Sequence, residues 1–553
     1  MRKTTKLLFL ILLVSVFLRF YQIDTNPKAL YGDSLTLVYD AYSILKTGHD
    51  QKGEFLPLVF SLGGGRPSGY IYATVPFVAL FGPIALASRM VSVLSGIGIV
   101  LLLYLLGRML INQEVGLAAA GVAALNPWEL SLSRGPFETH FALFLTLLGI
   151  FSFFKGLKNK YWFIIFGLAF GLSIQTYSTY LLTVPLFTAW LLIWNKNYKL
   201  IFDHQKRFFL FSALIIIVAS IILGLSLTLS KGTQDRFSNI NIFSTPEVRS
   251  IISERVKNDR NLDSLSPAVS NNLHKPQIEL AAVLAENYFR NFFPSFLFVH
   301  GDGEPRHNPA EMGEFFWVNA FLLILGIVYL FKFNKKLLLL FTGWILIAPI
   351  PTSLVGIPHA LRDSFLLPPL TFLMGIGLWK LWSMRHKSIN RILVTFLIVV
   401  FSFQFLYFFD RFYFIAPQKH ARNWSYPAKR ASLLALKNRQ KFDFIILSND
   451  IDNMEFAYPV YAKLDPQLVI KQSGSPAKIG EFTFFKYDNV YIGSLPHTRI
   501  IEFVKNLSGS VLYIGPDKEQ ANMENYVLLR GFNNYVDLVI TAKAGVPDLN
   551  LPH

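Results

Sequence analysis

One acidic and one basic side chain near the N-terminus have the type and setting for chemistry at a membrane surface. Asp33 lies in the segment NPKALYGDSLTLVYDAYSIL (26–45), just after a hydrophobic N-terminal run. A carboxylate there can act as a general base on a hydroxyl, or as the N-cap of the following helix, a position that Asp favours. Arg66 follows three glycines in SLGGGRPSGYIY. Its guanidinium can bind a phosphate through two hydrogen bonds, or reach out to lipid headgroups.

Two later segments carry further candidates for binding an anionic substrate. Arg134 and Glu138 lie in NPWELSLSRGPFETHFALF, at the predicted start of a helix, where Glu138 alternatively serves only to favour the helix dipole. His359 and Arg362 lie three residues apart in PTSLVGIPHALRDSFLLPPL. That spacing predicts one shared helical face beside a positive N-terminal end, which suits a phosphate. The alternative is that Arg362 only marks the membrane boundary.

A fourth segment, FLFVHGDGEPRHNPAEMGEFFWV (296–318), crowds His300, Asp302, Arg306 and His307 before an apolar run. Histidine and carboxylate together can bind a metal, and the same mixture suits a polar loop that folds over a sugar. The spacing matches no specific metal motif. We therefore predict loop contacts with a substrate, no metal ligands and no required cofactor.

The elements that must position these residues are membrane helices. The chain has 553 residues, of which 52% are hydrophobic and 16% charged, and uncharged apolar runs of about 18 to 22 residues recur, long enough to cross a bilayer. The first run continues as Arg19-Phe20-Tyr21 without a cleavage site, so we expect a retained span. We predict a mainly α polytopic helical bundle of about 11 spans, near 6–21, 86–107, 114–127, 139–155, 161–175, 178–194, 208–229, 315–331, 337–355, 362–380 and 392–409.

Charge placement predicts the orientation of this bundle. With the N-terminus in the cytoplasm, the short loops on that side are rich in lysine and arginine, as the positive-inside rule requires. The long segments 22–85 and 230–314 and the tail then face the extracytoplasmic side. We therefore attribute the net charge of +17 to the orientation of the protein in its membrane, and we expect no nucleic-acid partner. We expect that membrane to be a bacterial-type plasma membrane. The chain has no cysteine, which excludes disulfides and thiolate zinc sites.

The tail differs from the rest in composition. KFDFIILSND, NVYIGSL and SGSVLYIGPD are short apolar runs that end in turn residues, and HTRIIEFVKNLSG between two of them has helical spacing. We therefore predict two domains: a transmembrane domain over 1–410, with outer loops 22–85 and 230–314, and a small extracytoplasmic α/β domain over 411–553.

These segments, in this order, resemble the GT-C class of integral-membrane glycosyltransferases. They are most similar to the branch that contains protein O-mannosyltransferases and the aminoarabinose transferase that modifies lipid A. The resemblance covers about residues 1–410, and the motifs that carry it are YGDSL, RPSGYIY, LFGPIALASRMVSVLSG, NPWELSLSRGPFETHFAL and IPHALRDSFLLPPLTFL.

The resemblance implies a function in the cell envelope. It implies a polyprenyl-phosphate-linked sugar donor, an acceptor hydroxyl or amine on a protein, lipid or polysaccharide, and inversion at the anomeric carbon. Asp33 would be the general base, and Arg66, His359 and Arg362 would face the donor phosphate. Many relatives have a second carboxylate directly after the first-loop Asp, whereas this chain has Ser34 and Leu35, which weakens a metal-dependent mechanism.

A non-enzymatic function is the alternative that the residues leave open. Such a protein would transport a lipid-linked sugar, or would be a scaffold that presents the C-terminal domain outside. No ionisable residue falls near the middle of a predicted span, and ion-coupled transporters usually need such groups at the bilayer midplane.

Overall fold

The chain divides into two compact units. The computed structural model describes residues 3–195, 206–229, 246–385, 388–522, 526–543, 545 and 547–550. Residues 230–245, the first part of the predicted outer loop 230–314, lie outside the described residues. The first unit consists of Met1–Tyr21, Gly64–Gly69 and Ser92–Phe409, and the second unit of Gln22–Gly63, Tyr70–Val91 and Asp410–His553.

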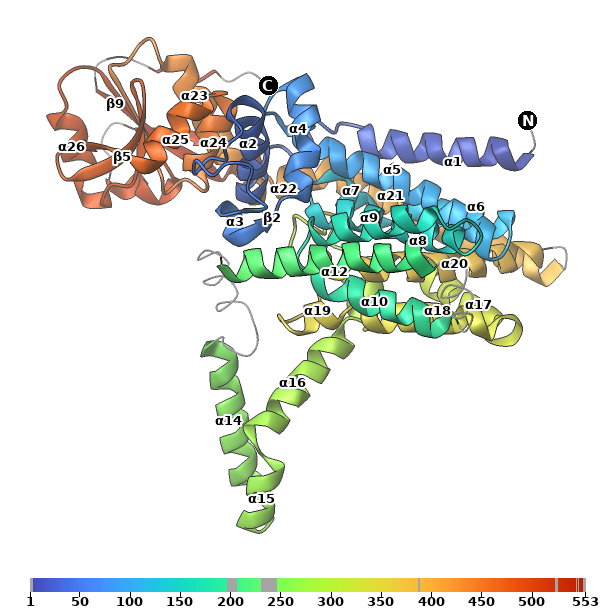
Figure 1. Cartoon of the computed structure of the whole chain (residues 1–553). Coiled ribbons are helices and arrows are strands. Elements are labelled where there is room, and N and C mark those ends of the chain that lie inside the picture. The colour runs from blue at the N-terminus through green and yellow to red at the C-terminus, as the bar shows by residue number, and fades with distance from the viewer. Residues whose placement is uncertain are drawn as a thin grey trace. The chain divides into compact units, whose positions relative to one another are not determined.

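The first unit is built from helices (Figure 1). Their bounds are α1 (Lys3–Phe20), α5 (Ala85–Leu110, of which Ser92 onward belongs here), α6 (Gln113–Leu125), α7 (Pro127–Arg134), α8 (Glu138–Gly156), α9 (Trp162–Ile174), α10 (Tyr180–Trp194), α12 (Lys206–Leu229), α14 (Pro246–Leu262), α15 (Pro267–Leu273), α16 (Pro276–Arg290), the π-helix η1 (Ser295–Val299), α17 (Trp317–Phe333), α18 (Lys335–Ile347), α19 (Ile350–Ser353), the 3₁₀ turn η2 (Ser364–Leu366), α20 (Leu367–Ser383) and α21 (Ser388–Asp410).

Each predicted span overlaps one of these helices, and the mainly α-helical fold class is confirmed. In the described part of the chain, six helices have the length and apolar composition to cross a membrane: Ala85–Leu110, Glu138–Gly156, Arg207–Leu229, Lys335–Ser353, Ser364–Ser383 and Arg391–Lys419. Five further apolar helices are shorter, among them α4 (Gly69–Phe81), which lies inside the segment predicted as outer loop 22–85.

Glycines allow the closest helix packing in the first unit. A Cβ on Gly326 of α17 would lie 2.0 Å from the carbonyl oxygen of Leu373 in α20, and a Cβ on Gly377 would lie 1.9 Å from that of Leu322. Both distances are far below any contact a methyl group can make, so only glycine lets these two backbones approach. Small residues serve this purpose in membrane helices, where packing rather than the hydrophobic effect drives association.

The second unit combines an α/β domain with segments from early in the chain. Its elements are α2 (Gly32–Thr47), β1 (Val59–Phe60), η3 (Arg411–Ile415), α22 (Ala416–Lys419), η4 (Arg422–Trp424), α23 (Tyr426–Asn438), β3 (Phe444–Ser448), α24 (Met454–Tyr461), α25 (Pro466–Gly474), β4 (Ala477–Ile479), β5 (Phe482–Tyr487), β6 (Val490–Gly493), η5 (His497–Arg499), α26 (Ile500–Asn506), β7 (Val511–Gly515), η6 (Asp517–Asn522), β8 (Tyr526–Arg530), η7 (Phe532–Asn534) and β9 (Val536–Lys543). The short elements α3 (Leu62–Gly65) and β2 (Arg66–Pro67) lie at the junction in sequence between the two units.

The sheet of this unit has seven strands in the order β4-β5-β6-β3-β7-β9-β8. The central strand β3 is parallel to β6 and β7, and the outer pairs are antiparallel. Figure 1 shows α26 on one side of the sheet and α23, α24 and α25 on the other. Ile500 and Val504 of α26 pack in a buried cluster with Ile446 and Tyr513 of the sheet. The three strands and the helix predicted in the tail are therefore β3, β6, β7 and α26.

Helix α2, which carries Asp33, is a part of this second unit. It contacts α24 and α25, the Tyr39 hydroxyl donates to the carbonyl of Leu464 at 2.8 Å, and the Leu30 N–H donates to the Tyr461 hydroxyl at 3.3 Å. Tyr70–Val91 also belongs to this unit, and its fully buried Arg89 donates to the carbonyls of Ile23, Pro27 and Ala29 at 2.6–3.0 Å. The α/β unit therefore includes much of the segment that sequence analysis assigned as the first outer loop of the transmembrane domain.

Candidate functional site

Arg66 and Glu138, predicted separately, form an ion pair in the first unit. Gly63, Gly64 and Gly65 all have φ between 74° and 81°, a region open mainly to glycine, so the three-glycine run turns the chain sharply before Arg66. Arg66 Nε donates to Glu138 Oε1 at 2.8 Å, with side-chain exposures of 6% and 12%. Glu138 is the first residue of α8, as predicted.

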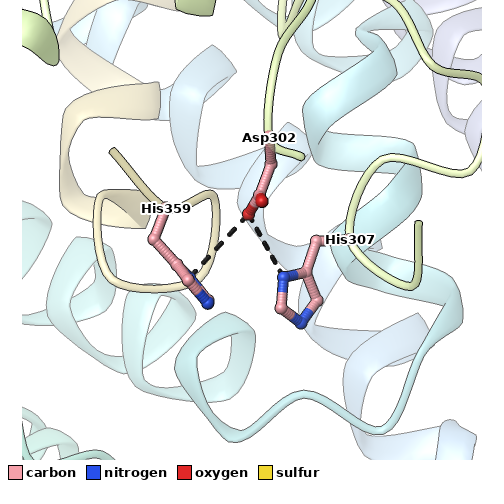
Figure 2. Close-up of side chains that lie close together, drawn as sticks. All are labelled: Asp302, His307 and His359. Carbon is pink, nitrogen blue, oxygen red and sulfur yellow. Dashed lines mark hydrogen bonds and ion pairs between the residues drawn. The ribbon is translucent and has the colours of Figure 1, made fainter. Parts of the chain in front are cut away.

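A second cluster joins two loops of the first unit. Asp302 and His307 come from the loop after η1, and His359 comes from the loop before η2. In Figure 2 both imidazoles point toward the Asp302 carboxylate. His307 Nδ1 lies 3.2 Å and His359 Nδ1 3.8 Å from Asp302 Oδ2, and the ring centroids are 4.7 Å apart. Asp302 and His307 are buried, whereas His359 keeps 24% side-chain exposure.

Backbone hydrogen bonds fix the position of Asp302. Its Oδ1 accepts from the Glu304 N–H at 2.8 Å, and its Oδ2 accepts from the Ala360 N–H at 2.7 Å. Its own N–H donates to Glu314 Oε1 at 2.9 Å, and the Asn308 amide donates to its carbonyl at 3.1 Å. The loop thus closes on itself and is bound to the second loop through Ala360.

Burial and mutual charge shift the titration of this cluster. Burial opposes ionisation of Asp302, but the hydrogen bond and charge of His307 and the charge of His359 bring its pKa down to about 2. Burial and the neighbouring charge of His307 lower the pKa of His359 to about 3. Burial raises the pKa of Asp363 to about 7, and burial with the Asp302 charge raises that of Glu314. At neutral pH the cluster presents a carboxylate beside a neutral imidazole.

His359 and Arg362 do not share a helical face, which corrects the sequence prediction. The helix on which both were expected begins only at Ser364. The Asp363 carboxylate accepts a hydrogen bond from the His359 N–H at 2.9 Å. This bond holds residues 359–363 in a turn before the helix begins. Arg362 is half-buried and makes no hydrogen bond or ion pair with the residues that the structure describes.

The remaining predicted residues have other surroundings. His300 is exposed, and Arg306 pairs with Glu304 of its own loop at 2.8 Å. Arg134, almost fully buried at the end of α7, donates from Nη1 to the carbonyls of Leu18, Arg19 and Tyr21 at 2.7–3.0 Å. These contacts hold the C-terminal end of α1, and a substrate contact of Arg134 stays a prediction.

Asp33 lies in the second unit, in the first turn of α2. The helix begins at Gly32 and its N-cap is Tyr31, which makes no side-chain capping bond. Asp33 is therefore not the N-cap. Its side chain is exposed, and its carbonyl accepts from the Thr36 hydroxyl at 3.1 Å. A carboxylate in a first turn still favours the helix dipole.

Sequence reasoning missed a buried polar network in the first unit. Glu129 bonds Arg19 through Oε2 and lies 3.1 Å from His140 Nε2 through Oε1, and all three side chains are fully buried. His140 Nδ1 also lies 3.2 Å from the carbonyl of Ser92. The signal in the sequence was a glutamate and a histidine on two neighbouring helices, with an arginine near the end of the first span.

Comparisons with known proteins give a family match and a similar fold. Residues 66–223 match the family model described as dolichyl-phosphate-mannose-protein mannosyltransferase. The fold is similar to that of ArnT from Cupriavidus metallidurans in the apo state, with a TM-score of 0.55 and 11% identity over 97% of this chain and 98% of that one. The structure of the same ArnT with bound undecaprenyl phosphate gives a TM-score of 0.54 and 12% identity, over 99% of this chain and 100% of that one.

The chain has the fold of ArnT. The archaeal oligosaccharyltransferase AglB from Archaeoglobus fulgidus, in complex with an inhibitory peptide and a dolichol-phosphate, is more distant, with a TM-score of 0.47 and 13% identity over 83% of this chain and 64% of that one. No curated protein matches the sequence. Arg66, Arg134 and Glu138 fall inside the matched family region, and the cluster of Asp302, His307 and His359 falls outside it.

Proposed function

We propose that this protein is a membrane glycosyltransferase that moves a sugar from a polyprenyl-phosphate carrier to an acceptor hydroxyl or amine at the extracytoplasmic face. One observation carries the proposal: the ArnT fold covers nearly the whole chain, and ArnT has been captured with undecaprenyl phosphate. The family model over 66–223 describes enzymes whose donor is also a sugar on a polyprenyl phosphate.

The chemistry needs a base and a cationic site for the leaving phosphate. Asp33, exposed in the first turn of α2, takes the proton of the acceptor as its oxygen or nitrogen attacks the anomeric carbon. The bond between that carbon and the phosphate oxygen breaks, and its electron pair stays on the carrier phosphate. This direct displacement inverts the anomeric carbon.

Arginine is the residue that best stabilises the charge developing on the phosphate. Arg66 is held by Glu138 at 2.8 Å, which restricts its rotamers and so lowers the entropy cost of binding a phosphate. Arg362, half-buried at the loop before η2, is the second candidate for this role.

The test is transfer in proteoliposomes. The purified full chain is reconstituted with undecaprenyl phosphate carrying radiolabelled mannose or aminoarabinose, and offered a serine-rich peptide, lipid A or a polysaccharide as acceptor. We expect a new glycosidic product that Asp33→Asn abolishes, without loss of thermal stability. Asp24→Asn is the matched control, because Asp24 is an exposed aspartate of the same segment.

Three outcomes would each overturn the proposal or a part of it. Full transfer by Asp33→Asn would remove Asp33 as the base. Movement of labelled carrier across the bilayer with no new glycosidic bond would identify a transporter of lipid-linked sugar, and partner binding alone would identify a scaffold.

A further inference from the structure

We propose that Asp302, His307 and His359 bind one divalent metal ion of the zinc type, which ties the loop after η1 to the loop before η2. This goes beyond the proposed transferase activity and departs from the sequence-based expectation that these residues bind no metal. The role is structural: the ion would fix two loops that come from distant parts of the sequence.

The distances fit metal ligands better than hydrogen bonds alone. Zinc binds nitrogen and oxygen at about 2.0–2.2 Å in a tetrahedron, which places neighbouring ligand atoms about 3.3–3.5 Å apart. Asp302 Oδ2 lies 3.2 Å from His307 Nδ1 and 3.8 Å from His359 Nδ1. The three ligand atoms all lie within 4.8 Å of one another. A separation of 3.8 Å is too long for a hydrogen bond, yet both rings turn toward the same oxygen (Figure 2).

The ligands are preorganised by the fold. Backbone N–H groups of Glu304 and Ala360 hold both oxygens of Asp302. The Leu361 N–H donates to His359 Nδ1 at 3.3 Å, a bond that the metal would replace, and the rings of Phe137 and His307 meet edge to face with centroids 5.4 Å apart. Rotamers locked in this way reduce the cost of ordering a metal site.

The charge around the cluster also favours a cation. Three carboxyl groups, those of Asp302, Glu314 and Asp363, are buried in these two loops, and Arg362 is the half-buried cation beside them. Buried charges in proteins are generally paired or bound to metals. A divalent ion at Asp302 would supply positive charge beside this buried carboxylate.

The ligand types select the metal. Two imidazoles and one carboxylate suit zinc and neighbouring transition metals, whereas magnesium and calcium prefer oxygen ligands throughout. Because His359 is the one partly exposed ligand, the remaining coordination position faces its side of the site and is open to water or another donor.

Two other groups of histidine and carboxylate in the described residues lack these features. In the group of Asp450, His497 and Glu519, the Lys518 ammonium forms an ion pair with Asp450 Oδ2 at 2.8 Å and so competes with a metal ion for that oxygen. At Asp259, His274 and Glu279 no ligand is buried. These two groups therefore serve as internal controls.

The experiment measures metal directly. The full chain is purified in detergent with a non-histidine affinity tag, and its metal content is determined by inductively coupled plasma mass spectrometry. We expect about one zinc ion per chain, with an X-ray absorption edge that reports only nitrogen and oxygen ligands. His307→Ala and His359→Ala should each lower zinc occupancy at least about ten-fold at limiting free zinc.

Matched controls separate this site from adventitious binding. His300→Ala, in the same loop, and His274→Ala, in one of the two control groups, should keep the wild-type zinc content. Wild-type protein stripped with EDTA should have a lower apparent Tm, restored by zinc sulfate and not by magnesium chloride, and this readout does not depend on any variant folding.

The results that would overturn the proposal are independent of transferase activity. Stripped wild-type protein that binds no zinc and shows no Tm shift refutes the site. Equal loss of zinc in the His300 and His274 controls assigns the metal elsewhere. Either result leaves the proposed glycosyl transfer untouched.

Discussion

Replacing Arg66 by methionine breaks the buried ion pair with Glu138, and the structure sets the size of the effect. At 2.8 Å and an effective dielectric of about 20, the gross Coulomb attraction is about 6 kcal/mol. Desolvation offsets much of this, and breaking one side of a buried pair costs about 3–5 kcal/mol. Because Glu138 keeps 12% exposure, we expect about 3 kcal/mol for Arg66→Met.

The double variant Arg66→Met/Glu138→Leu separates stability from function. Apolar residues of similar volume often replace a buried ion pair without loss of stability, so its apparent Tm should return close to that of the wild type. Transfer from the lipid-linked donor should stay impaired in both variants. A lost charged hydrogen bond of about 1.5–3 kcal/mol corresponds to about a 10- to 150-fold fall in kcat/KM.

The assays are thermal unfolding of the detergent-solubilised chain by intrinsic fluorescence and the proteoliposome transfer reaction. Arg290→Ala/Glu286→Ala is the matched control, because this pair is exposed to 42% and 41% and should contribute only about 0.3–0.5 kcal/mol. Arg66→Met with wild-type stability would refute the burial argument. Full transfer by the double variant would refute a role of Arg66 at the donor phosphate.

Three further predictions concern the rest of the fold. Glu129→Ala removes the carboxylate that bonds the fully buried Arg19 and should cost about 3–5 kcal/mol, seen as a large fall in monodisperse protein on size-exclusion chromatography. Gly377→Ala should lower the apparent Tm, because the new Cβ would lie 1.9 Å from a backbone oxygen. Gly121→Ala is the control and should leave the Tm unchanged, because the space around Gly121 is open. Equal Tm values for the two variants would refute the close approach at Gly377. Burial raises the pKa of Glu519 in the folded state. The contribution of Glu519 to folding stability is therefore greatest below its pKa in the unfolded chain, and it is lost as pH rises through its pKa in the folded protein. Glu519→Gln should flatten the dependence of Tm on pH, and an unchanged dependence would contradict this.

The helices and strands could be predicted from the sequence because their signals are local. An apolar run as long as that of α12 (Lys206–Leu229) or α21 (Ser388–Asp410) has one structural outcome in a bilayer. The short runs that became β3, β6 and β7 end at turn residues, and this is again a property of neighbouring residues.

The side-chain clusters could not be predicted because they depend on distant segments. Nothing in the spacing of Asp302 and His307 indicates that His359 faces the same carboxylate. The close approach at Gly377 depends equally on the facing helix. The helix expected at Arg362 begins only at Ser364. Before it, the Asp363 side chain accepts a hydrogen bond from the His359 backbone.

Two buried arginines, Arg134 and Arg89, donate hydrogen bonds to backbone carbonyls. Arg134 donates to three carbonyls at the end of α1, and Arg89 donates to the carbonyls of Ile23, Pro27 and Ala29 at 2.6–3.0 Å. Non-helical backbone near a membrane needs such donors, because an unsatisfied buried carbonyl is costly.

An arginine at a membrane boundary is therefore weak evidence for substrate binding until its contacts are known. Arg362 differs from these two because it is half-buried and makes no hydrogen bond or ion pair with the described residues. A guanidinium in that position has given up part of its hydration without a compensating bond, so an arriving phosphate gains a charged hydrogen bond at a reduced desolvation cost. By this argument, Arg362 together with Arg66 is a stronger candidate for the donor phosphate than Arg134.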